Sequence, residues 1–387
     1  MTARHGLPFV AATLLGPVSG CGTAATPESI RHPFVDAAPA GDWFTLTAAD
    51  RPPAFLVDAT ARHRLQLGEV SSPFVWSADG RRLAWRADGR WRSEIASVWV
   101  DVPDGAINRV PIAAETRASV NPLALSRDGQ RLLVQERRTL RLIEVDTGRE
   151  TGRGESGPVR VATFLRDGSV RMVVSPTGAA SDGELSLCDW DFRGPTVAVR
   201  WTLPTEGGAR TRLTPDGERL LVDGRRGLSL YASDGRRIAA PVEPWGGANH
   251  VAAILANRGV LAVEENGAAL RLRVFGSDGQ VRIDTAIPGK FPVLFGGEPA
   301  PALISIGVAP RETLFIDAAS GEIRRREPGM LPAGRWEDGR WADGDTSTIP
   351  ATGSVGTRLF WDTQHALVSV DPVSGPRRTV LTMAGGG

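Results

Sequence analysis

The chain of 387 residues is poor in several residue types that mark other classes of protein. It has only two cysteines, Cys21 and Cys188, so it is not a scaffold held together by several disulfides. Lys290 is the single lysine, and arginine therefore supplies nearly all of the positive charge. The 45 basic residues almost balance the 44 acidic ones, which argues against a dedicated nucleic-acid binder. We expect no nucleic-acid partner.

Motifs of several enzyme classes are missing as well. The five histidines form no His-x-His or His-x-x-x-His pair, so the sequence has no local zinc signature. It contains no Gly-x-Ser-x-Gly nucleophile elbow and no Gly-x-x-x-x-Gly-Lys-Ser/Thr phosphate-binding loop. We therefore expect no metal site, no cofactor and no catalytic residues.

The N-terminal segment has the pattern of a secretory signal. Residues 7–18 are apolar for about a dozen positions, which is too short for a transmembrane helix of about 20 residues but suits the core of a signal peptide. The segment ends in Val18-Ser19-Gly20-Cys21. No later run of about 20 apolar residues follows, so we expect no second membrane segment.

This ending resembles the bacterial lipoprotein signal, in which a branched apolar residue and two small residues precede a cysteine. The resemblance implies that residues 1–20 are removed and that Cys21 becomes the acylated first residue of the mature chain. Several acyl chains would give stable anchoring, whereas a single one is marginal. The alternative is a cleaved secretory signal in which the cysteine occurs by chance. Residues 21–32 would form a flexible tether between the lipid and the fold.

The rest of the chain repeats. A turn with the pattern Ser/Thr-x-Asp-Gly-x-Arg-Leu occurs at Ser77, Ser126 and Thr214, with a looser copy at Leu165. Each copy follows a short apolar stretch and precedes residues that we interpret as an alternating, half-buried strand. Aspartate accepts hydrogen bonds from nearby backbone amides, and glycine adopts the positive φ that closes the turn. The pattern predicts a β-hairpin in each copy.

A second glycine turn recurs behind the first, and its glycines are mostly 41 to 46 residues apart. A period near 40–45 residues with about four short strands per unit is typical of a β-propeller. We predict an all-β protein in which residues 33–382 form one β-propeller and residues 383–387 form a disordered tail. Counting turns gives eight four-stranded blades, or seven if the first and last units share one blade.

The Ser/Thr-x-Asp-Gly-x-Arg-Leu turn resembles the WD40-like repeats of the TolB-type periplasmic propellers. The second turn, as in Val145-Asp146-Thr147-Gly148, is similar to the repeat of quinoprotein-type propellers. Those repeats end in a tryptophan that docks on the next blade, and arginine and glutamate occupy the matching positions here. The resemblance implies a propeller lipoprotein of the bacterial envelope without a bound quinone.

Two regions carry side chains suited to binding or chemistry. Trp336, Asp338, Trp341 and Asp343 lie in the long final repeat, where indole faces beside carboxylates suit a sugar ring or a cation. The alternative is a pair of hairpin turns whose tryptophans pack between blades. In the run Cys188-Asp189-Trp190-Asp191, strand alternation would place both carboxylates on one face, where a pair can serve acid/base chemistry or bind arginines. Cys188 itself is predicted to be a buried strand thiol.

Together these features predict a monomeric, lipid-anchored scaffold that binds an envelope protein or a cell-wall ligand. It would lie on the outer side of the cytoplasmic membrane, or in the periplasm or outer membrane of a two-membrane envelope. The alternative function is a propeller enzyme that acts on carbohydrate or cell-wall polymer through acids at the channel mouth. A structural or sensory module of an envelope complex is a third reading.

Overall fold

The computed structural model shows an all-β protein. It describes residues 33–38, 43–48, 54–58, 62–68, 70, 74–88, 93–100, 107–111, 120–175, 183–205, 209–214, 216–224, 227–242, 250–254, 259–294, 303–309, 312–317, 322–328, 330–332, 336–337, 340–341, 358–362, 366–370 and 378–382. Within these ranges the chain forms strands and turns, and none of it is a helix long and apolar enough to cross a membrane.

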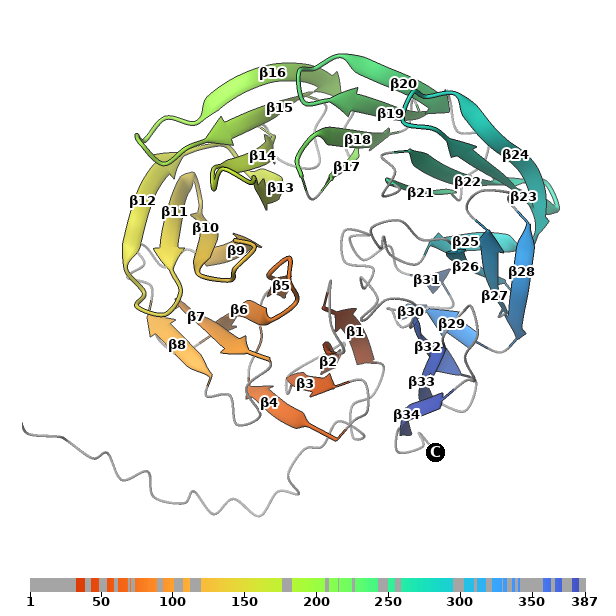
Figure 1. Ribbon diagram of the computed structural model, residues 1–387, viewed down its shortest axis with the longest axis horizontal. Coiled ribbons are helices and arrows are strands. Elements are labelled where there is room, and N and C mark those ends of the chain that lie inside the picture. Colours follow the sequence, from red (N-terminus) through yellow and green to blue (C-terminus); the bar gives the residue numbers. More distant parts are fainter. Residues whose placement is uncertain are drawn as a thin grey trace, which may run out of the picture.

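The strands form eight four-stranded antiparallel sheets that follow one another around a ring (Figure 1). Each sheet is built from its own stretch of chain, and its first strand lies nearest the centre of the ring. The first sheet lies beside the last one in the ring. The β-propeller predicted from the repeats is therefore confirmed.

The strands of the first four sheets, in order from the centre outwards, are β1 (Pro33–Ala37), β2 (Trp43–Ala48), β3 (Ala54–Asp58) and β4 (Arg64–Gly68); β5 (Val75–Trp76), β6 (Arg82–Asp88), β7 (Ser93–Trp99) and β8 (Asn108–Pro111); β9 (Val120–Leu125), β10 (Arg131–Glu136), β11 (Thr139–Glu144) and β12 (Glu150–Glu155); and β13 (Val159–Phe164), β14 (Val170–Val174), β15 (Gly183–Trp190) and β16 (Ala198–Thr205).

The other four sheets are β17 (Arg210–Leu213), β18 (Arg219–Gly224), β19 (Gly227–Ala232) and β20 (Arg237–Val242); β21 (His250–Ile254), β22 (Val260–Asn266), β23 (Ala269–Phe275) and β24 (Val281–Pro288); β25 (Lys290–Leu294), β26 (Leu303–Ala309), β27 (Glu312–Asp317) and β28 (Ile323–Pro328); and β29 (Met330–Pro332), β32 (Arg358–Asp362), β33 (Ala366–Val370) and β34 (Arg378–Thr382). A separate hairpin consists of β30 (Trp336–Glu337) and β31 (Arg340–Trp341).

The antiparallel order gives the ring two different ends. The turns that join the first strand to the second and the third to the fourth lie at one end, which we call the turn end. The first strands begin, and the second strands finish, at the opposite end, which we call the loop end. Both families of glycine turns seen in the sequence therefore lie at the turn end.

The middle strands of the sheets are covered on both faces by neighbouring sheets. Leu132, Leu133 and Val134 are consecutive in β10 and all are at most 1% exposed. The expected alternation of apolar and polar residues after the Asp-Gly turn is therefore wrong for this strand. It holds for outer strands such as β24, whose burial alternates through most of its length. A continuous apolar run is expected wherever both faces of a strand are buried.

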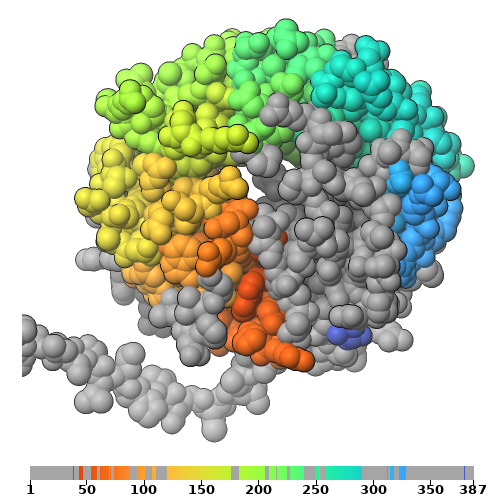
Figure 2. All heavy atoms as spheres, in the orientation of Figure 1, coloured from red at the N-terminus to blue at the C-terminus, as the bar shows by residue number. Residues whose placement is uncertain are grey.

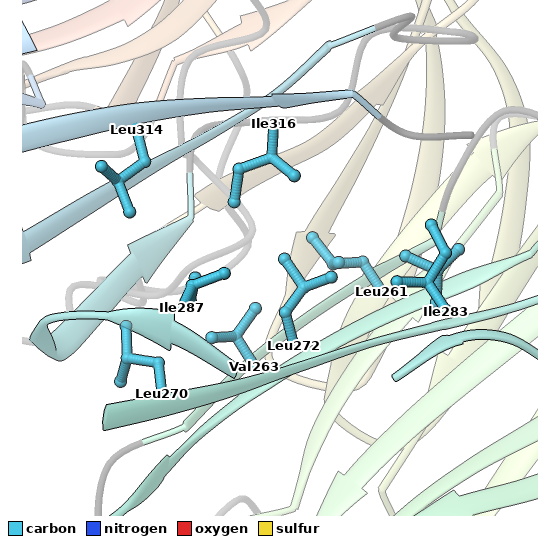
Figure 3. Packing of buried hydrophobic residues seen from close by; sticks show 9 residues of the cluster. Leu261, Val263, Leu270, Leu272, Ile283, Ile287, Leu314 and Ile316 are labelled. Carbon is cyan, nitrogen blue, oxygen red and sulfur yellow. The ribbon is translucent and has the colours of Figure 1, made fainter. Parts of the chain in front are cut away.

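Buried apolar clusters join one sheet to the next. Figure 3 shows the cluster in which Leu314 and Ile316 of β27 pack against Val263, Leu272 and Ile287 of the preceding sheet. Burying a side chain of this size stabilises the fold by about 1.5–3 kcal/mol. A single sheet leaves its apolar faces open, so the clusters make the sheets depend on one another.

The Asp-Gly turns share one set of hydrogen bonds. Ser77 Oγ donates to Asp79 Oδ1 at 2.5 Å, and the Arg82 amide donates to Ser77 Oγ at 2.9 Å. In the second copy, Ser126 Oγ donates to Asp128 Oδ1 at 2.6 Å and accepts the amide of Arg131 at 2.9 Å. In the third copy, Thr214 Oγ1 donates to Asp216 Oδ1 at 2.6 Å and accepts the amide of Arg219 at 3.0 Å. The serine or threonine hydroxyl thus links the aspartate to the strand that follows, which explains why the motif begins with that residue.

The arginine of the motif also connects neighbouring sheets. The side chain of Arg82 is 1% exposed, and its Nη1 donates to the carbonyl of Gly129 in the next Asp-Gly turn at 3.2 Å. Two sheets further on, in the looser copy, Val170 occupies the position of the motif arginine, and the next residue, Arg171, donates from Nη1 to the carbonyl of Gly217 at 2.8 Å. A Cβ at Gly129 would lie 2.8 Å from Arg82 Cβ. Glycine is needed there for its φ of +69° and also for the close approach of the arginine.

Replacing Gly129 by alanine should therefore destabilise the fold by two effects, and Gly267 provides a matched control. Gly267 has a similar φ of +64°, but a Cβ there would meet no atom within 4 Å. We expect Gly267→Ala to cost about 1–2 kcal/mol through backbone strain alone. Gly129→Ala should cost about 1–3 kcal/mol more because the methyl group overlaps Arg82. Chemical denaturation measures both, and equal losses would show that the arginine contact is unimportant.

Candidate functional site at the loop end of the ring

Most of the candidate binding residues predicted from the sequence lie outside the described residues. This applies to Cys21, Asp338 and Asp343. The backbones of Trp336 and Trp341 are described, and they are directly opposite each other in the β30–β31 hairpin. A hairpin is one of the two interpretations that the sequence left open for these tryptophans, and their role in ligand binding stays a prediction.

The two carboxylates of the Cys188–Asp191 segment have different surroundings. Asp189 in β15 accepts two hydrogen bonds from Arg171, from Nε at 2.7 Å and from Nη2 at 2.9 Å. Arg200 Nη1 donates to the same carboxylate at 2.7 Å. Asp191 follows the last residue of β15, so strand alternation does not fix its direction, and it accepts the backbone amide of Arg193 at 3.0 Å.

The arginine partners control the protonation of Asp189. Burial alone would raise the pKa of its carboxyl, but the hydrogen bonds and charges of Arg171 and Arg200 outweigh burial and lower that pKa below its usual value. A general acid needs a raised pKa. Asp189 therefore acts as the anionic partner of two arginines at the turn end and lacks the raised pKa of a general acid.

Other titratable side chains occupy structural positions in the described part of the chain. Cys188 is 3% exposed, and burial raises the pKa of its thiol to about 11, as expected for an unreactive strand cysteine. His63 Nδ1 lies 3.1 Å from Asp58 Oδ2, next to the ring of Trp43. The described residues contain no group of three or more metal-binding side chains.

The loop end gathers polar side chains from successive sheets around the centre of the ring. Arg86 Nη1 donates to Asn121 Oδ1 of the next sheet at 3.1 Å. One sheet further, Gln135 accepts the backbone amide of Val159 at 3.0 Å. Figure 2 shows that the ring opens near its centre, beside atoms of the orange and yellow-green sheets. Both contacts join the first strand of one sheet to the second strand of the sheet before it, on the inner side of the ring.

Arg160 on β13 continues this series. Its Nη1 donates to the carbonyl of Ala209 at 2.6 Å, just before β17 of the next sheet, and its Nη2 donates to Ser175 Oγ at 3.3 Å. Both acceptors are neutral. Partial burial lowers the pKa of Arg160, and no carboxylate among the described residues lies within ion-pair distance to offset this. Among the described residues, Arg160 therefore has neutral acceptors.

Two further groups of the loop end come from β17 and β21. Arg212 Nη1 donates to the carbonyl of Ala252 in the first strand of the next sheet. His250, the first residue of β21, places Nε2 at 3.2 Å from Asp223 Oδ1 of the preceding sheet. No motif in the sequence distinguishes these residues. The available signal was their position at the start of the apolar run that precedes each Asp-Gly turn.

Comparison with known proteins bears on the fold. No protein family and no curated protein matches the chain. Among solved structures, dihydro-heme d1 dehydrogenase NirN in complex with DHE has a TM-score of 0.52 at 16% identity, over 93% of this chain and 75% of that one. BamB from Moraxella catarrhalis has a TM-score of 0.48 at 13% identity, over 76% and 87%. TolB from Acinetobacter baumannii has a TM-score of 0.35 at 14% identity, over 66% and 54%. All three are β-propeller proteins, and the likeness at these identities concerns the fold alone.

The role of Asp189 can be tested with Asp189→Asn, and Asp191→Asn is the matched control. Removing the carboxylate charge leaves Arg171, whose side chain is 5% exposed, without its main partner. We expect a loss of about 3 kcal/mol in the free energy of unfolding, the lower end for a broken buried ion pair. Asp191 is 59% exposed on its side chain, and its replacement should change stability by less than about 0.5 kcal/mol.

The lowered pKa of Asp189 also predicts how the stability of the wild type and of Asp189→Asn depends on pH. Because the folded-state pKa of Asp189 is lowered, its stabilisation is complete above the unfolded pKa of about 4 and is lost as the pH falls below that value. The difference in unfolding free energy between the wild type and Asp189→Asn should therefore shrink below about pH 4. A difference that stays constant down to acid pH would mean that the charge of Asp189 does not matter.

Proposed function

We propose that this protein is a lipid-anchored β-propeller that acts as a binding scaffold in the bacterial cell envelope. Cys21 would carry the lipid, residues 21–32 would form the tether, and the loop end of the ring would bind a protein or a cell-wall ligand. The single observation that carries the proposal is the order of features along the chain. An apolar segment, a small-residue cleavage pattern with cysteine, a short polar stretch and eight sheets arranged in a ring follow one another.

The chemistry of the described side chains supports binding over catalysis. The acidic candidate that the structure describes within a strand, Asp189, is bound by two arginines with a lowered pKa. The polar groups of the loop end are arginine, asparagine, glutamine, histidine and aspartate side chains that come from several sheets. Such a set suits recognition, since arginine is enriched at protein interfaces. Binding residues often lie on the connections between the strands of a regular scaffold.

Anchoring is tested by replacing Cys21, with Cys188 as the control. We expect the wild-type protein to incorporate a clickable fatty acid and to fractionate with membranes, since multiple acyl chains anchor stably. Cys21→Ser should abolish both. Cys188→Ala should leave both unchanged, because Cys188 is 3% exposed and its thiol is protonated at neutral pH. Labelling that survives Cys21→Ser, or is absent from the wild type, would contradict the proposal.

The binding surface is tested by photo-crosslinking in intact cells. A photoreactive amino acid at Asn121, exposed at the loop end, is compared with one at Val199, which is 59% exposed on the outer strand β16. We expect one reproducible adduct with an envelope component from position 121 and none from position 199. Equal crosslinking at both positions, or none at either, would count against a binding role for the loop end.

A further inference from the structure

The hairpin that joins β10 to β11 carries two adjacent arginines at its tip. Glu136 of β10 is opposite Thr139 of β11, so Arg137 and Arg138 form a two-residue turn at the loop end of the ring. Both arginines are exposed, and neither guanidinium group makes a hydrogen bond or an ion pair to a described residue. Their charges are therefore accessible to a ligand.

The backbone of Arg137 has an unusual conformation for an arginine. Its φ is +53°, in the left-handed region that favours glycine. The hairpin between β22 and β23 also has a two-residue turn, between Asn266 and Ala269, and Gly267 occupies the position that matches Arg137 with a φ of +64°. A glycine at position 137 would relieve the strain. An exposed residue that is kept in a strained conformation is a candidate for function.

The buried acids at the same end of the strands have partners of their own. Arg141 Nη1 lies 3.8 Å from Glu136 Oε2, and His250 Nε2 lies 3.2 Å from Asp223 Oδ1. Glu155, the last residue of β12, is exposed, and no ion pair joins it to a described residue. At this end of the third sheet, two unpaired arginines therefore outnumber one unpaired acid.

Arginine recurs in the sequence between the second and third strands of other sheets. Residues 89–92, between β6 and β7, include two arginines, and residues 225–226, between β18 and β19, are both arginine. The eight stretches of this kind contain eight arginines and two acids. The stretches that join one sheet to the next belong to the same end and contain one arginine and four acids. The loop end thus has an excess of arginine, although the whole chain has a net charge of only +1.

The first strand determines which end of the ring would face an anchoring lipid. β1 begins at Pro33, at the loop end, so the proposed tether of residues 21–32 joins the ring there. A tether of this length spans at most about 40 Å when fully extended. The loop end is also one of the two broad faces of the ring, which Figure 1 views down its shortest axis. The other face carries the Asp-Gly turns with acids such as Asp128 and Asp167.

We propose that the loop end lies against an anionic phospholipid surface, where Arg137 and Arg138 bind lipid phosphates. A guanidinium group matches the geometry of a phosphate, and basic residues close to an anionic bilayer are attracted to it. An acyl anchor and a basic patch together hold a protein to a membrane more stably than either alone. This inference rests on the proposed lipid anchor and specifies the face of the ring that meets the membrane.

Vesicle binding tests this contact in the absence of the lipid anchor. The protein is the chain from residue 21 onwards with Cys21→Ser, which contains every described strand and lacks the apolar segment of residues 7–18. Phosphatidylcholine vesicles with and without phosphatidylglycerol are compared by sedimentation, and inorganic polyphosphate is a soluble probe. We expect binding to the phosphatidylglycerol vesicles, weakened by added salt, and no binding to phosphatidylcholine alone.

Charge variants then locate the contact. Arg137→Gly and Arg138→Gln should each weaken vesicle binding about fivefold. Ala268→Arg adds an arginine at the exposed position that matches Arg138 in the sixth sheet, and it should strengthen binding about fivefold. Arg193→Gln is the control, because Arg193 is 90% exposed on its side chain at the turn end, and it should leave binding unchanged.

Thermal unfolding separates binding from stability. Because glycine is favoured at the φ of position 137, we expect Arg137→Gly to have a melting temperature equal to or above that of the wild type. Weaker vesicle binding without a loss of stability supports a role in binding. A lower melting temperature with unchanged vesicle binding would instead assign Arg137 to the fold and overturn the inference.

Three further results would overturn the inference: equal binding to both kinds of vesicle or to neither, an equal loss of binding in Arg193→Gln, or binding of polyphosphate without binding of vesicles. The second would mean that only the total charge matters, and the third would assign the arginines to a soluble phosphate polymer. Lipid labelling at Cys21 tests the proposed function separately. Labelling that persists without vesicle binding would remove this contact and leave the anchored scaffold in place.

Discussion

The fold depends on the burial of both faces of each sheet against its neighbours in the ring. A sheet such as β9–β12 has consecutive buried residues in its middle strand, Leu132, Leu133 and Val134, and cannot cover them by itself. The arginine contacts reinforce this dependence. Arg82 reaches from one sheet to the Gly129 carbonyl of the next, while its guanidinium carbon lies 4.3 Å from the centre of the Trp99 ring and Nη2 lies 2.6 Å from Asp146 Oδ1. The Arg82 side chain thus contacts the Gly129 turn of the next sheet, the Trp99 ring and the Asp146 carboxylate.

The near-total use of arginine over lysine has a structural consequence. A guanidinium group carries five donors in a planar fork, so it can bind a carbonyl of the next sheet and a carboxylate of its own sheet at the same time. Arg171 does this with Gly217 and Asp189. A lysine ammonium has no such planar arrangement, and an Arg171→Lys exchange would not preserve both contacts. The turn end of the ring is therefore held by directional bonds in addition to apolar burial.

The sequence was a good guide to the fold and a poor guide to the site. The Asp-Gly turns were predictable because their hydrogen bonds are local, between residues such as Ser77, Asp79 and Arg82. Burial on both faces was missed, because the strand after the turn was expected to have one solvated face. The role of Arg160 was missed for a different reason. Its acceptor is the carbonyl of Ala209, a backbone group 49 residues away, and any residue type would supply it.

The contrast between the two ends of the ring explains why function is assigned to only one of them. At the turn end, short glycine turns satisfy their own backbone groups, and Arg82 and Arg171 have carboxylate partners in Asp146 and Asp189. At the loop end, the acceptors of Arg160 that the structure describes are both neutral. An anion that enters there gains a charge-assisted hydrogen bond without displacing an existing ion pair of Arg160, whereas at the turn end it would compete with carboxylates already in place.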